Sequence, residues 1–449
     1  MPPITPAGSR FPSFSISPAF AAALAAAGCA PLLLAPATAG AQQQPPRFLL
    51  VDRDSDVIWV VRDANGDGVI DASEVAPWFD ATNAAATPGL ASPASLAVRR
   101  GGLVIVGDGD STRRAINIFL DRNHDGDALD AGESAQGANL FAASDISFGS
   151  PQGAAFDADG YAYIANASNA AGLDAIYRLV DLDGDGLFMS FGEIVEVVGA
   201  PAFGSSSGSS FNPAAIVFIG AAGYMRNSGA NFHGVYRFED LDGNGRADDP
   251  GEFTGFWTLT PENLSGVTPA AGLALEVDRA RPGSLYTLQT GAGGVDYLVR
   301  LTDVDGSGAA HEPGEAVIVY ANAASGFSAA GIASLPDGRV ILTEARGSVL
   351  LLTDLDGDGT FTGDGEAQVI LSEIEAIGAA RQVALFPCPG DWNEDLVVNS
   401  NDISAYLTDW LDAVASGTVQ ADVDASGSTN STDISAFLTA WLAGVQGGC

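Results

Sequence analysis

Residues 180–193 read VDLDGDGLFMSFGE, an acidic loop that directly follows a short β-prone run. Related loops begin at five other aspartates, and the six starting positions are Asp63, Asp121, Asp181, Asp240, Asp303 and Asp354. The steps between neighbouring starts range from 51 to 63 residues. A recurrence of nearly constant period indicates one supersecondary unit repeated along the chain. The sequence therefore predicts six structural repeats, each built around one acidic loop.

Each repeat also contains four short segments that are rich in β-branched and aromatic residues, as strands are. In the third repeat these segments are residues 153–156, 161–164, 176–179 and, beyond the acidic loop, 194–197. In the fifth repeat the first strand is expected at residues 272–275. Four-stranded sheets repeated six times predict a mainly β fold, a six-bladed β-propeller, in which few sheet edges stay exposed.

The two ends of the repeat region indicate that the ring closes on itself. The first repeat begins with a second strand, residues 47–51, and its missing first strand recurs after the sixth repeat as residues 382–386. The stretch 151–164, PQGAAFDADGYAYI, is similar to the blades of six-bladed propellers of the NHL and TolB-like kind. That resemblance covers roughly residues 45–387 and implies an architecture rather than an activity. A solenoid and tandem sandwiches are the alternative folds.

The acidic loops have the ligand pattern of a calcium site. Calcium prefers oxygen ligands at loop positions 1, 3 and 5, a backbone carbonyl at position 7 and a closing carboxylate, with a turn glycine at position 6. The candidate ligands are Asp63, Asn65, Asp67, Val69, Asp71 and Glu74; Asp121, Asn123, Asp125, Asp127 and Glu133; Asp181, Asp183, Asp185, Leu187 and Glu193; Asp240, Asp242, Asn244, Arg246 and Glu252; Asp303, Asp305, Ser307, Ala309 and Glu315; and Asp354, Asp356, Asp358, Thr360 and Glu366. Glu74 lies at position 12, as in an EF-hand, whereas the other five loops close one residue later, after a glycine. The later closure resembles calcium loops between strands of other secreted repeat proteins, and the fifth loop, with Ser307 at position 5, is the weakest match.

The alternative is that the loops are only tight turns, which Asp-Gly sequences form readily. The six loops, however, hold 27 of the 56 acidic residues of the chain. Without cations these carboxylates would repel one another and destabilise the folded state. We therefore expect about six Ca²⁺ ions in the propeller, each tying the third strand of a blade to the fourth.

The C-terminal segment contains a second duplication, in which residues 391–411 recur at 422–442. The candidate calcium ligands are Asp391, Asn393, Asp395, Val397, Asn399 and Asp402 in the first copy, and Asp422, Asp424, Ser426, Ser428, Asn430 and Asp433 in the second. Apolar residues then recur at helical spacing, as Ile403, Tyr406, Leu407, Trp410 and Leu411 in the first copy and Ile434, Phe437, Leu438, Trp441 and Leu442 in the second. The two loop-helix units are expected to pack against each other through these stripes.

This tandem resembles a type I dockerin domain, with Ser431 and Thr432 where that family carries its recognition pair. The resemblance implies up to two further Ca²⁺ ions and a cohesin as a possible partner. Two departures qualify it. Leu396 replaces the turn glycine, which is expected to weaken the first site, and residues 438–441 stand where cohesin-binding dockerins carry basic residues. The alternative role is a calcium-stabilised module for surface attachment or sorting.

Charge excludes some partners. The formal net charge is -37, and all 19 basic residues are arginines. Nucleic acid and anionic membranes are therefore not expected partners, because phosphate binding needs basic patches that are absent from the sequence. No stretch after the N-terminal segment is apolar and long enough to span a membrane.

The N-terminal segment and the cysteines indicate an extracellular location. Residues 1–41 are predicted to be a secretory signal peptide that ends in an A-x-A cleavage site, with lipoprotein cleavage at Cys29 as the alternative. The propeller is then expected over residues 42–387 and the dockerin-like module over 388–449. Cys388 and Cys449 bracket that module, and a disulfide between them is expected, metal ligation being the alternative.

No catalytic constellation can be identified. The chain has three histidines and lacks a nucleophile elbow, a zinc motif and a phosphate loop. The polar residues of the innermost strands are Gln152, Asn212, Arg381 and Gln382, and no inward acidic cluster is predicted. We expect a secreted or cell-surface, non-catalytic binding or scaffolding protein with an unknown extracellular ligand. The alternatives are a calcium-dependent propeller hydrolase of lactones, phosphoesters or sugar derivatives, and a component of a cohesin-dockerin assembly.

Overall fold

The computed structural model describes residues 46–80, 89–109, 114–123, 125–139, 149–167, 174–199, 211–229, 232–258, 269–270, 272–290, 295–322, 329–345, 347–372, 377–378 and 380–445. The predicted signal peptide, the alternative cleavage site at Cys29, and Cys449 lie outside these residues. Cys388 is buried, and its pairing with Cys449 stays a prediction.

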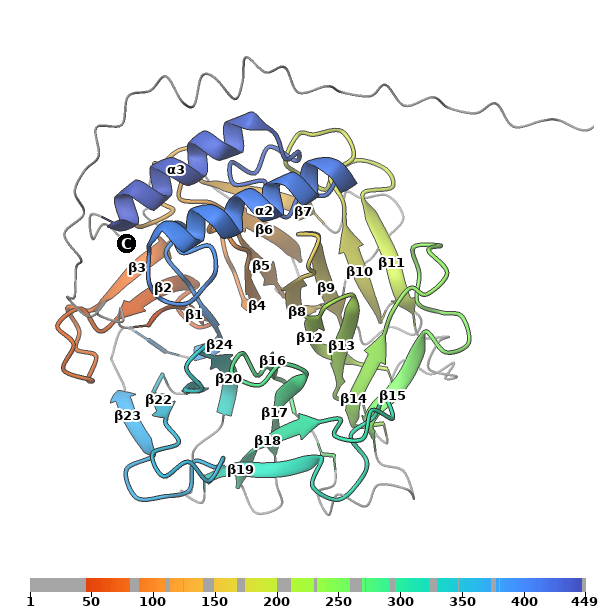
Figure 1. Cartoon of the computed structure of the whole chain (residues 1–449), viewed down its shortest axis with the longest axis vertical. Helices are drawn as coiled ribbons and strands as arrows, with labels where there is room; N and C mark the ends of the chain where they lie inside the picture. The colour runs from red at the N-terminus through yellow and green to blue at the C-terminus, as the bar shows by residue number, and fades with distance from the viewer. Residues whose placement is uncertain are drawn as a thin grey trace, which may run out of the picture. The chain divides into compact units, whose positions relative to one another are not determined.

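The described chain forms six antiparallel sheets of four strands each (Figure 1). The strands of each sheet are given from the innermost outward. The first sheet consists of β24 (Ala380–Leu385), β1 (Arg47–Asp52), β2 (Val57–Arg62) and β3 (Val75–Asp80), and the second of β4 (Pro93–Val98), β5 (Val104–Asp108), β6 (Ala115–Phe119) and β7 (Ser134–Asn139). The third consists of β8 (Pro151–Phe156), β9 (Ala162–Asn166), β10 (Ala175–Leu179) and β11 (Ile194–Gly199). The other three are β12 (Pro213–Ile219), β13 (Ala222–Asn227), β14 (Gly234–Phe238) and β15 (Phe253–Thr258); β16 (Leu275–Val277), β17 (Ser284–Thr290), β18 (Asp296–Thr302) and β19 (Ala316–Asn322); and β20 (Ala329–Ser334), β21 (Val340–Glu344), β22 (Val349–Leu352) and β23 (Ala367–Leu371).

The sheets close into a ring. The innermost strands contact one another in the cyclic order β4, β8, β12, β16, β20 and β24, and β24 returns to β4. β24 also pairs with β1, so the last strand of the propeller completes the first blade, with Phe48 opposite Leu385. The six-bladed propeller and its closure are therefore confirmed, and the solenoid and tandem sandwiches are excluded.

The core lies between neighbouring blades rather than within one of them. Trp78 of β3 is fully buried, and its ring meets Phe119 of the next blade at 6.0 Å and Phe386 at 5.4 Å, edge to face in both cases. Aromatic pairs favour such T-shaped contacts. Each blade therefore depends on its neighbours for burial of its apolar faces.

The start of the fifth blade differs from the prediction. Residues 272–275 were expected to form its first strand, but β16 begins only at Leu275. The Ala274 carbonyl accepts both from Leu288 N at 3.3 Å and from Thr287 Oγ1 at 3.0 Å, so backbone contact with β17 continues one residue before β16. Further upstream, the Ala270 carbonyl accepts from the Arg226 guanidinium.

Two helices follow the propeller, α2 (Ser400–Ser416) and α3 (Ser431–Val445). α2 begins in a capping box formed by Asn399 and Asp402, which satisfies two otherwise unpaired backbone N–H groups. No helix among the described residues is long and apolar enough to cross a membrane.

The expected packing of the two helical stripes is correct only in part. Tyr406 and Phe437 stack with ring centroids 4.1 Å apart, and Trp392 packs edge-on against both. The four leucines of the predicted stripes do not contribute to this packing. Leu407, Leu411, Leu438 and Leu442 are 40 to 61% exposed. The aromatic rings already fill the space between the helices, so these leucines point to solvent.

Candidate metal centres and the axial channel

Each acidic loop connects the third strand of a blade to the fourth, and hydrogen bonds within the loop fix its turn. In the third loop, the Asp181 carboxylate accepts from the backbone N–H groups of Gly184 at 2.7 Å and Gly186 at 2.8 Å. Asp185 accepts from Leu187 in the same way. Both glycines have positive φ, 78° and 79°, which other residues rarely adopt. The chain thus winds around the side-chain oxygens at positions 1, 3 and 5.

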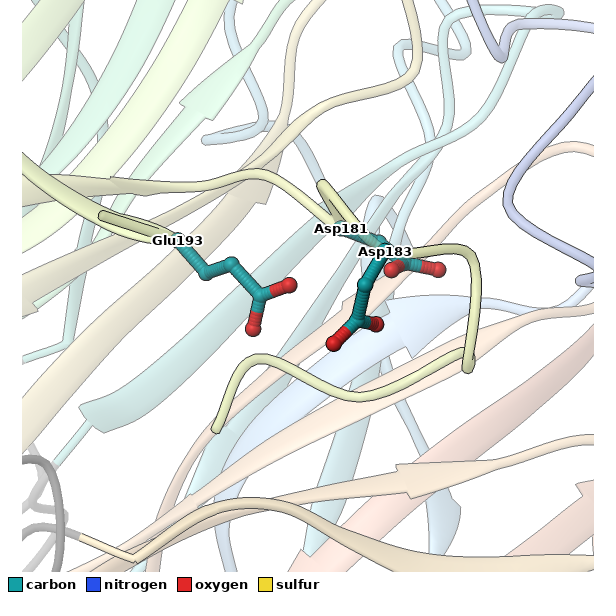
Figure 2. A group of neighbouring side chains, drawn as sticks. All are labelled: Asp181, Asp183 and Glu193. Carbon is teal, nitrogen blue, oxygen red and sulfur yellow. The ribbon is translucent and has the colours of Figure 1, made fainter. Parts of the chain in front are cut away.

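The closing glutamate reaches back across each loop. In the third loop, one Glu193 oxygen accepts from Leu182 N at 3.0 Å and the other from Ser190 N at 2.6 Å. Figure 2 shows this carboxylate on the side of the loop that faces Asp183. Glu133, Glu252, Glu315 and Glu366 accept from the same two loop positions, 2 and 10, whereas Glu74 of the first loop accepts from positions 2 and 9. In every loop the second donor lies three residues before the glutamate.

The one-residue difference in closing position therefore leaves the hydrogen bonds of the glutamate unchanged in kind. The extra residue in loops two to six lies between position 8 and the second donor, and in these five loops a glycine precedes the glutamate. These glycines are Gly132, Gly192, Gly251, Gly314 and Gly365, with φ between 84° and 96°. Loops of both lengths thus present a carboxylate that accepts from the backbone N–H at position 2.

Among the described residues, at least four of the loops gather three carboxylates within reach of one ion. The sets with ligand atoms within 4.8 Å of one another are Asp181, Asp183 and Glu193; Asp240, Asp242 and Glu252; Asp303, Asp305 and Glu315; and Asp354, Asp356 and Asp358. In the fourth loop Asp248 and Asp249 also approach Glu252 within this distance, although neither was among the predicted ligands. Hard carboxylate oxygens in such sets match the donor preference of calcium.

Each loop also pairs with the preceding blade through the backbone N–H at position 8, a contact that was not predicted. The six hydrogen bonds run from Ile70 to Ile370 O, from Ala128 to Trp78 O, from Phe188 to Gly137 O, from Ala247 to Val197 O, from Ala310 to Phe256 O and from Phe361 to Val319 O, at 2.6 to 2.8 Å. The acceptors lie in the outermost strands. The sequence signal was present, because position 8 is apolar in all six loops. The acidic loops therefore link neighbouring blades around the whole ring.

The two C-terminal loops repeat the propeller loops with an aspartate as closing acid. Asp402 accepts from Asn393 N and Asn399 N, and Asp433 accepts from Val423 N and Asn430 N. The carboxylates at position 1 are buried here. Burial, followed by the charge of Asp402, raises the pKa of Asp391 to about 7. A bound cation would remove this penalty by neutralising the buried charges.

Leu396 does not distort the first C-terminal loop, although it replaces the turn glycine. Its N–H donates to Asp391 Oδ2 at 2.9 Å, as Gly427 N donates to Asp422 at 3.1 Å. Its φ of 68° is in the left-handed region, which is costly for leucine. The side chain is buried among core residues of the propeller, which offsets that cost.

The C-terminal units dock on the end of the propeller that carries the acidic loops. Arg99 is buried and donates to the backbone carbonyls of Val419 and Asp422. Arg122 Nη1 donates to the Asp424 carbonyl at 3.1 Å. The second C-terminal loop is thus held by two propeller arginines.

The docked units cover one mouth of the axial channel, where a cavity of about 590 Å³ remains. Glu276 of β16 lines it, 22% exposed, and Arg279 lies between Glu276 and Glu394 of the C-terminal segment. Burial raises the pKa of Glu276 to about 7, with Arg279 lowering it and Glu394 raising it further. The sequence predicted no inward acidic cluster, and the structure places one carboxylate of an innermost strand, Glu276, at this mouth, beside Glu394 of the C-terminal segment. Glu276 lies directly after residues 272–275, which were expected to form that strand.

No protein-family model matches the sequence, and a search of curated proteins found no relative. Among solved structures, the chain is similar to one in the nidogen/laminin complex, at TM-score 0.49 and 12% identity over 76% of this chain and 98% of that one. It is also similar to TolB from Acinetobacter baumannii, at TM-score 0.46 and 13% identity over 76% and 67% of the two chains. A further likeness is to PQQ-bound aldose sugar dehydrogenase from Streptomyces coelicolor, at TM-score 0.42 and 18% identity over 66% and 85%. These likenesses concern the backbone alone. By its sheet topology, the chain is a six-bladed β-propeller followed by two loop-helix units.

Proposed function

We propose that this protein is a secreted or cell-surface β-propeller that binds calcium in its acidic loops and serves as a non-catalytic binding or scaffolding module. The observation that carries the proposal is the gathering of three carboxylates within 4.8 Å in loop after loop. Ions in these loops would stabilise two connections at once, the hairpin between the third and fourth strands and the hydrogen bond to the preceding blade. Calcium would then be a structural requirement of the ring.

Removal of calcium should destabilise the folded protein, because the loop carboxylates would then repel one another. Carboxylates held this close repel one another when no cation neutralises them, although solvent and salt screen part of this repulsion because many of them are exposed. The loops would open, and their blade-to-blade hydrogen bonds would be lost with them. We expect the chelated protein to unfold at a temperature at least about 10 °C lower than the calcium-loaded protein.

The test is calcium titration of the mature protein by calorimetry, together with thermal unfolding in calcium and in chelator. About six to eight ions per chain and a large loss of stability in chelator are expected. One ion or none, with unchanged unfolding, would mean that the loops are ordinary turns.

A variant in one loop tests whether that particular loop binds a calcium ion. Glu252→Gln removes one closing carboxylate and should lower the calcium stoichiometry by about one ion per chain. Glu196→Gln is the matched control, because Glu196 lies on β11 and contacts the side chain of Arg246, whereas the predicted ligand of Arg246 is its backbone carbonyl. Equal stoichiometry in both variants would contradict the assignment of the fourth loop.

The C-terminal units are proposed to serve attachment or sorting, with up to two more calcium ions and a dockerin-like fold. Ser431 and Thr432, the positions of the dockerin recognition pair, are exposed, and so is Ser400 in the first copy. A cohesin is the alternative partner. A pull-down with a purified type I cohesin tests it, and binding that is lost in a Ser431→Arg, Thr432→Arg double variant would establish that partner.

One observation favours the hydrolase as a second candidate. Glu276 lines the covered mouth and has its pKa raised to about 7, where a carboxyl group can act as general acid or base. If the protein hydrolyses lactones or phosphoesters there, Glu276→Gln should abolish turnover in a substrate panel without changing calcium stoichiometry. No turnover by the wild-type protein would leave the binding role.

A further inference from the structure

The axial channel has a second mouth, at the opposite ends of the innermost strands. There a smaller cavity of about 100 Å³ is lined by the polar side chains of Arg53, Ser92, Ser150, Gln152, Arg381 and Gln382. Ser92 and Ser150 directly precede β4 and β8, whereas the cavity under the C-terminal units lies where these strands end. Gln382 lines both cavities, so they belong to one channel.

Two arginines give this mouth a positive charge in a strongly acidic protein. Arg53 Nε donates to Ser92 Oγ at 2.9 Å, which fixes its guanidinium at the rim. Arg381 extends from β24, and its Nε is buried without a hydrogen-bond partner among the described residues. A donor that is buried and unpaired destabilises the protein, and a ligand that accepts from this guanidinium would offset that cost.

The nearby charges do not neutralise this pair. Burial lowers the pKa of Arg381, the charge of Arg53 lowers it further, and Asp54 offsets only part of these effects. Asp54 is itself an exposed side chain. Within the described part of the chain, the guanidinium of Arg381 is therefore held near a second cation, and the charge of Asp54 compensates for it only in part.

The other half of the lining is apolar. It consists of Ala94, Ala214, Leu273 and Ala330, from four different blades, and Leu273 is 42% exposed. A volume of about 100 Å³ corresponds to roughly three water molecules at their share of the liquid. That space suits a carboxylate with a short alkyl chain. A dianion fits less well, since the formal charge of the chain is -37.

We propose that this mouth binds the carboxylate of a small monoanionic ligand between Arg53 and Arg381, with its alkyl part on the alanines and Leu273. The Arg381 fork supplies directed hydrogen bonds to the carboxylate, as arginine does in charge-assisted pairs. The site is independent of the calcium loops and goes beyond the proposed function.

The test is isothermal titration of the calcium-loaded full chain with sodium butyrate at low ionic strength. Butyramide, of the same shape but neutral, and sodium sulfate, a dianion, are titrated in parallel. Saturable butyrate binding is expected, with no detectable binding of butyramide and weaker binding of sulfate. Arg381→Gln and Arg53→Gln should each weaken butyrate binding about tenfold, the loss of one charge-assisted contact.

Arg339→Gln is the matched control, because Arg339 pairs with Asp337 in the hairpin after β20, away from this mouth. It removes the same charge and should leave butyrate binding unchanged. All variants should keep the wild-type calcium stoichiometry, which excludes misfolding as the cause. The proposal is overturned if butyrate shows no saturable binding up to about 0.1 M, a concentration well beyond millimolar affinity. It is equally overturned if sulfate or butyramide binds as tightly, or if both arginine variants bind like wild type.

Discussion

Leu396 shows how one residue can serve the propeller at the expense of its own loop. It holds a φ of 68° that favours glycine, yet its side chain is buried in the propeller core. Leu396→Gly would relieve about 1–2 kcal/mol of backbone strain but lose about 2–5 kcal/mol of burial. We expect a net loss of up to about 4 kcal/mol in the free energy of unfolding, measured by denaturant titration in calcium.

Ala425→Gly is the matched control for Leu396→Gly. Ala425 occupies the left-handed region at φ 52° without a core contact of this kind. The substitution should therefore stabilise the protein slightly, by up to about 1 kcal/mol. If both glycine variants change stability by the same amount, the burial argument for Leu396 is wrong.

Glu276 should make stability depend on pH. Its pKa in the folded protein is raised to about 7, above the ordinary value of 4.5. A raised carboxyl pKa gives a stabilising contribution that is complete below the unfolded pKa and is lost as pH rises through the folded pKa. Relative to Glu276→Gln, the wild type should thus lose up to about 3 kcal/mol between pH 4.5 and 8. If the free energy of unfolding of the wild type and of Glu276→Gln changes with pH in the same way, Glu276 has an ordinary pKa.

At the scale of elements, the sequence predicts what is local and repeated. Strands such as β10 follow from β-prone runs of the right length, and the acidic loops follow from ligand spacing. The pairing of loop position 8 with the preceding blade could not be assigned, because it joins residues such as Ile70 and Ile370 that only ring closure brings together. Likewise, β16 was placed too early because its start depends on where pairing with β17 begins, at Leu275 opposite Thr287, which the local sequence does not show.

β24 is the element on which closure depends, and truncation tests this. Its residues Val383 and Leu385, with the following Phe386, are at most 4% exposed, and burying each such side chain is worth about 1.5–3 kcal/mol. Together they rival the net stability of a typical domain, about 5–15 kcal/mol. A chain ending at Pro387 should unfold cooperatively, whereas one ending at Gly378 should not. Circular dichroism melts that are the same for both chains would disprove the closure role.

For the whole molecule, the docking of the C-terminal units could not be predicted, because Arg99 and Asp422 are 323 residues apart. Arg99→Met should release these units, since it removes two hydrogen bonds and the 3.7 Å ion pair with the buried Asp422 carboxylate, a loss of about 3–5 kcal/mol.

Arg100→Met is the matched control for Arg99→Met in the test of whether the C-terminal units leave the propeller. Arg100 also reaches the C-terminal segment, pairing with Asp409 at 3.1 Å, but it is 47% exposed, and exposed pairs contribute less than about 1 kcal/mol. Small-angle scattering should therefore give a larger radius of gyration for Arg99→Met alone. Because Arg99 holds the second C-terminal loop, chelator should expand the wild type in the same direction if calcium shapes that loop. Unchanged scattering of Arg99→Met would mean that Leu396 and the remaining contacts suffice to keep the channel mouth covered.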